Sequence, residues 1–209
     1  MLPTQFKPLT FDDLIGPARQ AGKLAQVTLA KAALHRQPVK EIFYGPPGTG
    51  KTALASILAL ALAKSPLAIR ELSGLETSIE VIRELMNSCA MAGLFGDYQV
   101  TIVQELDRMP AAARDLLLHH LDRLPPGCAF IGTSNMAIDD LTERFQTRFQ
   151  VTKILGPTSD EIGAFLLKRW PEIPWFDAQQ LAIGSGGNVR AALSDAEKYL
   201  DSIAAKIAA

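Results

Sequence analysis

The 209-residue sequence predicts an α/β fold with a five-stranded parallel sheet, followed by a small all-helical unit. Strand-like runs rich in β-branched residues alternate with helix-like segments over most of the chain. The first such run leads straight into a turn rich in Gly and Pro, and an Ala/Leu-rich helix follows that turn. After Gly156 and Pro157 only helical periodicity is found. We therefore expect an α/β domain over 1–155 and a helical lid domain over 156–209.

The strands expected in the first domain cover residues 39–44, 68–72, 99–103, 128–133 and 149–154. Helices are expected at 52–64, at 79–91 and from Pro110 onward. Pro110 suits the first turn of a helix, because the N–H that proline lacks would have no partner there. The helix over 52–64 is apolar on nearly all sides, so we expect it to be buried against the sheet. In the second domain we expect helices at about 158–170, 177–183 and 188–205.

The composition is that of an ordinary globular protein, with 48% hydrophobic and 21% charged residues, which excludes wholesale disorder. A net charge of -1 gives no support to binding nucleic acid through bulk charge. Two cysteines, Cys89 and Cys128, exclude a disulfide scaffold or a Cys-rich zinc site and fit a reducing compartment. The N-terminus lacks a signal-peptide pattern, and the longest apolar run, 53–63, is too short to span a bilayer. We expect a cytoplasmic protein without a membrane partner.

A phosphate-binding loop is predicted between the first strand and the helix that follows it. Its residues match the pattern Gly-x-x-x-x-Gly-Lys-Ser/Thr and are Gly45, Pro46, Pro47, Gly48, Thr49, Gly50, Lys51 and Thr52. Glycines let backbone N–H groups curl around phosphates, and the helix N-terminus adds a positive field. Lys51 would reach the terminal phosphates, and the Thr52 hydroxyl would bind Mg²⁺. The strand before the loop and the helix after it favour binding of ATP or ADP with Mg²⁺ over a chance match.

The strand over 99–103 ends in Gln104 and Glu105, where a phosphate-loop ATPase needs two acidic residues. Glu105 can act as the base that activates the attacking water. Gln104 stands at the magnesium position, where its amide can accept a hydrogen bond from a metal-bound water but brings no negative charge. The sequence therefore predicts an ATPase and leaves open whether Gln104 slows or abolishes hydrolysis.

These segments resemble the AAA+ ATPases, and within them the small subunits of sliding-clamp loaders of the replication factor C type. The resemblance covers almost the whole chain and rests on residues 6–16, 45–52, 71–74, 79–84, 104–109, 133–135, 146–149 and 187–190. Gln104 departs from the family pattern, which has Asp at that position. We also expect the family's third domain, a collar that holds the pentameric ring, to be absent from this chain.

The resemblance implies roles for residues around the nucleotide of the same subunit. Ile15 and Gly16 would border the adenine. Asn135 would be the sensor 1 residue, an amide that positions water near the γ-phosphate. Arg190 would be the sensor 2 residue of the lid and would contact the γ-phosphate.

The resemblance also implies residues that act on partners. Arg148 would be an arginine finger that acts in trans on the ATP of a neighbouring subunit, with Arg144 as the alternative. Arg83, on the helix from residue 79, would face DNA inside a ring. The implied assembly is a homo- or hetero-oligomer of AAA+ subunits, with DNA and a sliding clamp or another scaffold protein as partners.

Two other functions remain open. Gln104 is compatible with an ATP-dependent assembly module that hydrolyses ATP slowly or not at all. A protein-remodelling AAA+ ATPase would need an aromatic pore loop after the second strand, and residues 73–78 contain no aromatic side chain. Leu94, Phe95 and Gly96 have suitable residue types but follow the next helix, in a different loop.

Overall fold

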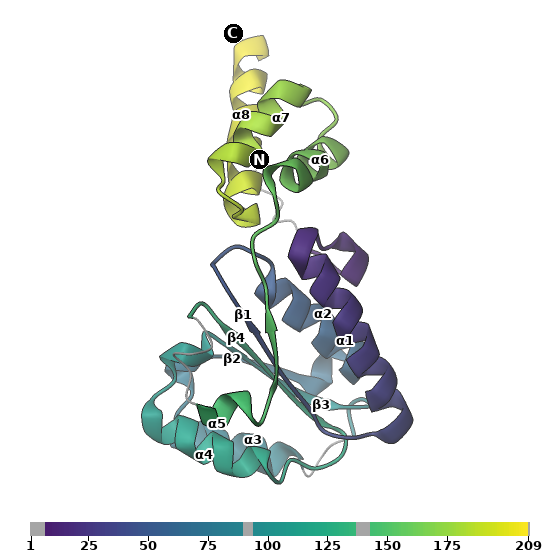
Figure 1. The fold of residues 1–209 in the computed structure, drawn as a ribbon, viewed down its shortest axis with the longest axis vertical. Coiled ribbons are helices and arrows are strands. Elements are labelled where there is room, and N and C mark those ends of the chain that lie inside the picture. The colour runs from purple at the N-terminus through teal and green to yellow at the C-terminus, as the bar shows by residue number, and fades with distance from the viewer. Residues whose placement is uncertain (1–6, 90–93, 137–142, 209) are drawn as a thin grey trace.

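A computed structural model describes residues 7–89, 94–136 and 143–208, and it confirms the predicted fold class (Figure 1). The parallel sheet has the strand order β2-β3-β4-β1-β5. Its strands are β1 (Val39–Tyr44), β2 (Ile69–Ser73), β3 (Gln99–Gln104), β4 (Cys128–Ser134) and β5 (Gln150–Lys153). The helices are α1 (Gly16–His35), α2 (Lys51–Ala63), α3 (Ile79–Ser88), α4 (Ala111–Leu121), α5 (Glu143–Gln146), α6 (Ser159–Arg169), α7 (Trp175–Gly184) and α8 (Val189–Ala208).

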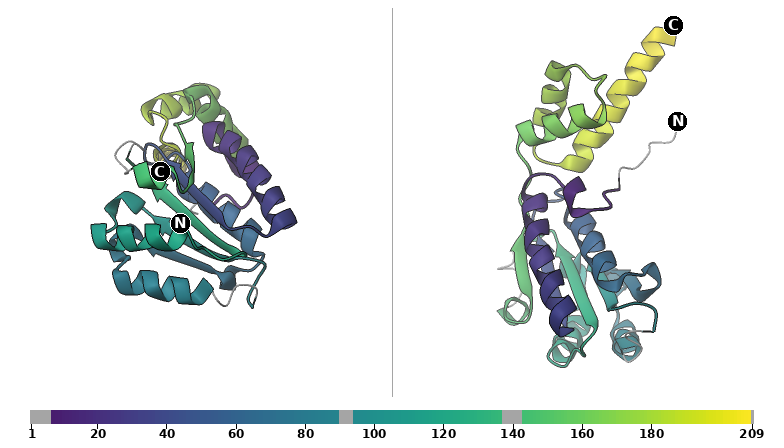
Figure 2. Two further views of the ribbon diagram at one scale, coloured as in Figure 1. Left: turned by 60° about the horizontal axis from the view of Figure 1, so that its bottom comes forward. Right: turned by 90° about the vertical axis from the view of Figure 1, so that its right-hand side faces the viewer.

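Helices cover both faces of the sheet, with α1 and α2 on one side and α3 and α4 on the other (Figures 1 and 2). Neighbouring residues of β1 point to opposite faces of the sheet. Phe43 packs with α1 and α2, whereas Ile42 packs with α3 and α4. Because every strand is parallel, all carboxyl ends meet at one edge of the sheet. That edge is where α/β proteins of this kind bind ligands.

Helix α1, which the sequence analysis did not anticipate, buries small side chains. Its core face consists of Ala18, Ala21, Gly22, Ala25 and Ala32, whereas Leu24, Val27 and Leu34 are exposed. Of the large apolar residues of α1, only Leu29 packs against this core, so most of them lie on the solvent side. Helix α2 is buried as predicted, and helix α3 is described up to Ser88, so the expected end of that helix at Met91 lies outside the described residues.

The helices from α6 onward form a third apolar core beyond the carboxyl edge of the sheet (Figure 1). Its buried members are Ile162, Leu166, Ile173, Ala178, Ala182, Ala192 and Ala196. Thr158 and Glu161 form a capping box at the start of α6, which fixes where this helix begins. The division at residues 155 and 156 stays a prediction. Within the described residues, no helix has both the length and the apolar character needed to cross a membrane.

Candidate nucleotide site

The loop between β1 and α2 depends on glycine at the positions that the pattern predicts. Gly45, Gly48 and Gly50 have φ angles of +144°, +75° and +95°, a region that other residues rarely adopt. A Cβ atom on Gly45 would also lie 2.0 Å from the backbone oxygen of Ile154. The loop therefore brings its backbone to the N-terminus of α2, where N–H groups without helical partners favour an anion.

Lys51, the first residue of α2, has a buried ammonium group. Its Nζ donates hydrogen bonds to the carbonyl oxygens of Gly45 at 2.8 Å and Pro46 at 2.6 Å. Burial lowers the pKa of Lys51, and the positive charge of Arg190 lowers it further against the opposing effect of Asp107. A polyanion beside this ammonium would offset the cost of burying its charge.

A cavity of about 330 Å³ opens beside the loop and gathers most of the predicted site residues. Those that line it are Ile15, Pro47, Gly48, Thr49, Gly50, Lys51, Thr52, Gln104, Glu105, Asn135 and Arg190. Apolar side chains that the prediction missed, Leu14, Ala18, Phe165 and Leu193, line it as well. The cavity thus has the size and mixed lining of a small-molecule site.

Glu105 follows β3 in a left-handed conformation, with a φ of +52°. Its backbone N–H donates to the Thr133 hydroxyl at 3.3 Å, and its carboxylate accepts a hydrogen bond from Arg108 Nη1 at 2.9 Å. Asp107 accepts a hydrogen bond from the backbone N–H of Asn135 at 3.3 Å, which ties the end of β4 to the residues after β3. Arg108 was not predicted as a site residue, although its spacing of three residues from Glu105 is a usual one for an ion pair in a helical turn.

Gln104 is the last residue of β3 and pairs in register with Ser73 of β2. Its side-chain Nε2 donates a hydrogen bond to the carboxylate of Glu71, a partner that the sequence analysis did not identify. The oxygen donors expected for Mg²⁺, the Thr52 hydroxyl and the Gln104 amide, line the same cavity. Because Mg²⁺ prefers oxygen ligands and keeps several waters, this donor set fits a hydrated magnesium ion.

Other predicted residues lie outside the cavity lining. Gly45 and Pro46 lie in the loop, where their carbonyls bind Lys51. Gly16 lines a second hollow, between α1 and α6, and has no room for a Cβ atom beside Pro157. Arg83 is exposed on α3, on the face of the sheet opposite α1 and α2.

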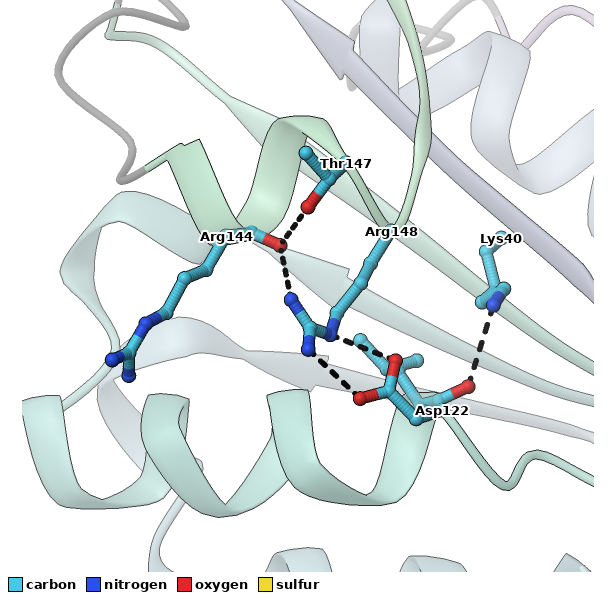
Figure 3. A network of polar contacts seen from close by, with 6 residues as sticks. Lys40, Asp122, Arg144, Thr147 and Arg148 are labelled. Carbon is cyan, nitrogen blue, oxygen red and sulfur yellow. Dashed lines mark hydrogen bonds and ion pairs between the residues drawn. The ribbon is translucent and has the colours of Figure 1, made fainter.

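Arg148 is held within its own chain by an ion pair (Figure 3). Its Nε and Nη2 each lie 2.8 Å from one carboxylate oxygen of Asp122, and Nη1 donates to the Arg144 carbonyl at 3.2 Å. This bidentate contact lowers the pKa of Asp122. The Arg144 side chain points away from this pair (Figure 3).

A glycine-rich loop between a strand and a helix, at the carboxyl edge of a parallel sheet, defines a P-loop nucleotide-binding protein. Within this class, the sequence profile of the ATPase family associated with various cellular activities (AAA) matches residues 42–156, which is more than half of the chain. The chain belongs to this family.

Curated relatives include proteins of DNA replication. The chain is 28% identical over 151 residues to replication factor C small subunit 2 of Pyrobaculum aerophilum, covering 69% of this chain and 45% of the relative. It is 27% identical over 166 residues to replication-associated recombination protein A of Haemophilus influenzae, covering 79% of this chain and 36% of the relative. The chain therefore spans less than half the length of either relative.

Among solved structures, the RuvB Holliday junction branch migration motor of Thermotoga maritima has the same fold. The TM-score is 0.76 at 21% identity, and the match covers 93% of this chain and 65% of the other. At this identity the likeness shows the fold alone.

Proposed function

We propose that this chain binds ATP or ADP with Mg²⁺ in the cavity beside the phosphate loop and hydrolyses ATP. The observation that carries this proposal is the convergence of Lys51, Thr52, Glu105, Asn135 and Arg190 on one cavity. In ATP hydrolysis the protein mainly positions groups and stabilises charge, because the water attacks a phosphoryl group with little covalent help. A site for this reaction needs cations at the phosphates and a carboxylate at the water, and this cavity has both.

Each residue then has a defined task. Lys51 and Arg190 would contact the β- and γ-phosphates, and the Thr52 hydroxyl would hold Mg²⁺. Bound Mg²⁺ would neutralise charge on the phosphate oxygens. Glu105 would accept the proton of the attacking water, which Asn135 would orient. Because Glu105 is paired with Arg108 in this structure, it must turn from that exposed ion pair to the water, at a cost of at most about 1 kcal/mol.

The apolar part of the cavity suits the adenine ring. Ile15 and Leu14, which precede α1, line it together with Phe165 of α6 and Leu193 of α8. Gly16 lies next to Ile15 but outside this lining, so any contact that it makes would be at the edge of the ligand. The nucleotide would therefore touch both the α/β domain, 1–155, and the helical lid domain, 156–209.

We propose that Arg148 completes the site of a neighbouring subunit. It lies two residues before β5, which begins opposite Glu41 near the start of β1, whereas the phosphate loop follows the end of β1. Arg148 is thus at the opposite edge of the sheet from its own cavity. To reach a neighbour's γ-phosphate it must leave Asp122, and a phosphate offers its guanidinium the same bidentate geometry. Contacts of this head-to-tail kind build rings or spirals.

The names of the two curated relatives, which are replication proteins, support a DNA substrate, as in a clamp-loader-like ATPase with a sliding clamp or another scaffold protein as partner. Arg83 is the proposed DNA contact on α3, but Glu80 and Glu84 of the same helix are acidic. One α3 helix therefore offers DNA little net attraction, and binding should need several subunits side by side.

A slow ATP-dependent assembly module is the second candidate, and Gln104 is the observation that favours it. Such a module would bind ATP as tightly as a hydrolase but release phosphate far more slowly. Comparing turnover with ATP affinity distinguishes these two functions. The protein-remodelling function has less support, since the connection after β2 exposes Leu75 and contains no aromatic residue.

Lys51→Ala tests the nucleotide site directly. Isothermal titration calorimetry with MgADP should detect binding to the wild type and none to the variant, because the buried ammonium contacts the phosphates. Lys64→Ala removes an exposed lysine just after α2 and serves as the matched control. Equal affinities of the wild type and Lys51→Ala would exclude the phosphate loop as the binding site.

A further inference from the structure

The side chains of Gln104 and Glu71 contact each other at the edge of the nucleotide site. They belong to neighbouring parallel strands, and the Gln104 Nε2 donates a hydrogen bond to the Glu71 carboxylate. Gln104 lines the nucleotide cavity, and both residues line a smaller hollow beside it, next to Glu105. The amide thus lies between the Glu71 carboxylate and the proposed magnesium position.

We propose that Glu71 is a positioning residue that fixes the orientation of the Gln104 amide and thereby equips it to act at the magnesium ion. This inference rests on the proposed function of the cavity. An ionised carboxylate only accepts hydrogen bonds, whereas a glutamine amide has a donating nitrogen and an accepting oxygen. The Glu71 carboxylate can therefore pair only with the Nε2 atom of Gln104. The Oε1 atom of the amide is then free to turn toward the cavity.

The orientation matters because a hydrated magnesium ion presents donors to its surroundings. Waters bound to Mg²⁺ need acceptors, and an amide that presented its NH₂ group would repel them. Glu71 also polarises the amide, because a hydrogen bond to a charged acceptor shifts electron density toward the amide oxygen. The hydrogen bond thus makes the Gln104 amide oxygen more negative, which partly replaces the carboxylate charge that glutamine lacks.

A purely structural role is the alternative, in which the hydrogen bond only joins the ends of β2 and β3. Glu71 is exposed, so a contact of that kind would contribute little to stability. It would also be independent of magnesium. Metal dependence therefore distinguishes the positioning role from the structural one.

The first test uses Glu71→Gln, which keeps the size of the side chain but can pair with Gln104 in either amide orientation. Binding of a fluorescent ADP analogue is measured over a range of Mg²⁺ concentrations. We expect the variant to need about threefold to tenfold more Mg²⁺ for half-maximal binding, as for the loss of one charge-assisted hydrogen bond. Binding without Mg²⁺ should stay unchanged. Glu76→Gln, which removes another exposed carboxylate from the connection after β2, is the matched control.

The second test exchanges the two residues. Gln104→Glu alone sets two carboxylates against each other and should weaken Mg²⁺-dependent binding. The double variant Glu71→Gln/Gln104→Glu restores a donor–acceptor pair, with the charge now at the cavity, and should recover the wild-type Mg²⁺ requirement or a lower one. Recovery in the double variant is expected only if the two side chains act as a pair.

A third readout needs neither nucleotide nor metal. In the NMR spectrum of the nucleotide-free protein, the Gln104 side-chain NH₂ signals, assigned through their loss in Gln104→Glu, should shift in Glu71→Gln and stay in place in Glu76→Gln. Unshifted signals, or a Mg²⁺ requirement that changes equally in both variants, would overturn the role of Glu71 while the nucleotide site stands. Absence of nucleotide binding to the wild type would overturn the proposed function and this inference together.

Discussion

Glu41 is a buried carboxyl group on β1, the strand beside edge strand β5, and its titration should make the stability of the fold depend on pH. It lies on β1 between Val39 and Phe43, with only 2% of its surface exposed, and it faces the core under α1. Its Oε1 accepts a hydrogen bond from the Thr28 hydroxyl of α1 at 2.9 Å. Burial raises the pKa of Glu41 to about 7, and the Thr28 hydrogen bond opposes this effect.

The size and sign of the effect follow from linkage between protonation and folding. The unfolded chain has the ordinary pKa of 4.5 at this residue, and the folded chain about 7. The folded state therefore holds the proton more tightly, so the contribution of Glu41 to stability is fully present below pH 4.5 and is lost as the pH rises through 7. At about 1.4 kcal/mol for each pH unit, the loss amounts to about 3 kcal/mol. Above pH 7 it should level off, because both states are then ionised.

Glu41→Gln removes this titration while it keeps the shape of the side chain. The free energy of unfolding is measured by urea denaturation followed by circular dichroism. Between pH 4.5 and pH 8 the wild type should lose about 3 kcal/mol relative to the variant. The exposed Glu172→Gln controls for the loss of a negative charge. A difference between Glu41→Gln and wild type that stays constant over this pH range would show that Glu41 titrates normally, and the reasoning would be wrong.

Three further predictions concern the proposed ATPase. Glu105→Gln should keep its affinity for ATP and lose at least about 100-fold in phosphate release, since it removes the base; unchanged turnover would refute that role. Arg148→Ala should bind ATP normally and lose about three to five orders of magnitude in turnover, and mixing it with Lys51→Ala subunits should restore activity; a mixture that stays inactive beside an active wild type would exclude action in trans. Arg83→Glu should abolish salt-sensitive DNA binding by the nucleotide-bound assembly without changing ATP affinity. If the wild-type assembly does not bind DNA at low salt, a protein partner is favoured instead.

Local patterns were sufficient to predict the strands and the phosphate loop, because both depend on residues close together in sequence. The strand over 39–44 agrees with β1 at both ends, and the loop has the glycine conformations that its pattern requires. Helix α1 was not predictable in the same way. Its core face is mostly alanine and glycine, and Leu29 is the only large apolar residue of α1 packed against the core, so the usual signal, large apolar residues at helical spacing, points largely to the solvent side.

Pairings between distant residues could not be predicted, because they depend on strand order and register. Gln104 meets Glu71 only because β3 lies beside β2, and Arg148 meets Asp122 only because β5 begins near the end of α4. The buried state of Glu41 is a similar case. Its position two residues from both Val39 and Phe43 would place it on their face of the strand, but only the packing of α1 shows that this face is covered there.

The phosphate loop is joined directly to the start of the last helix, so a ligand bound at the loop could affect the helical part of the chain. The backbone N–H of Val189 donates to the Gly48 carbonyl at 2.9 Å, and a Cβ atom on Gly48 would lie 1.8 Å from the Asn188 side-chain oxygen. Arg190, one residue further along α8, lines the cavity. A phosphate that rearranged the loop would therefore shift the first turn of α8, and a rigid helix transmits such a shift along its length. Since α8 also packs against α6 and α7, a shift of its first turn would reach the third apolar core.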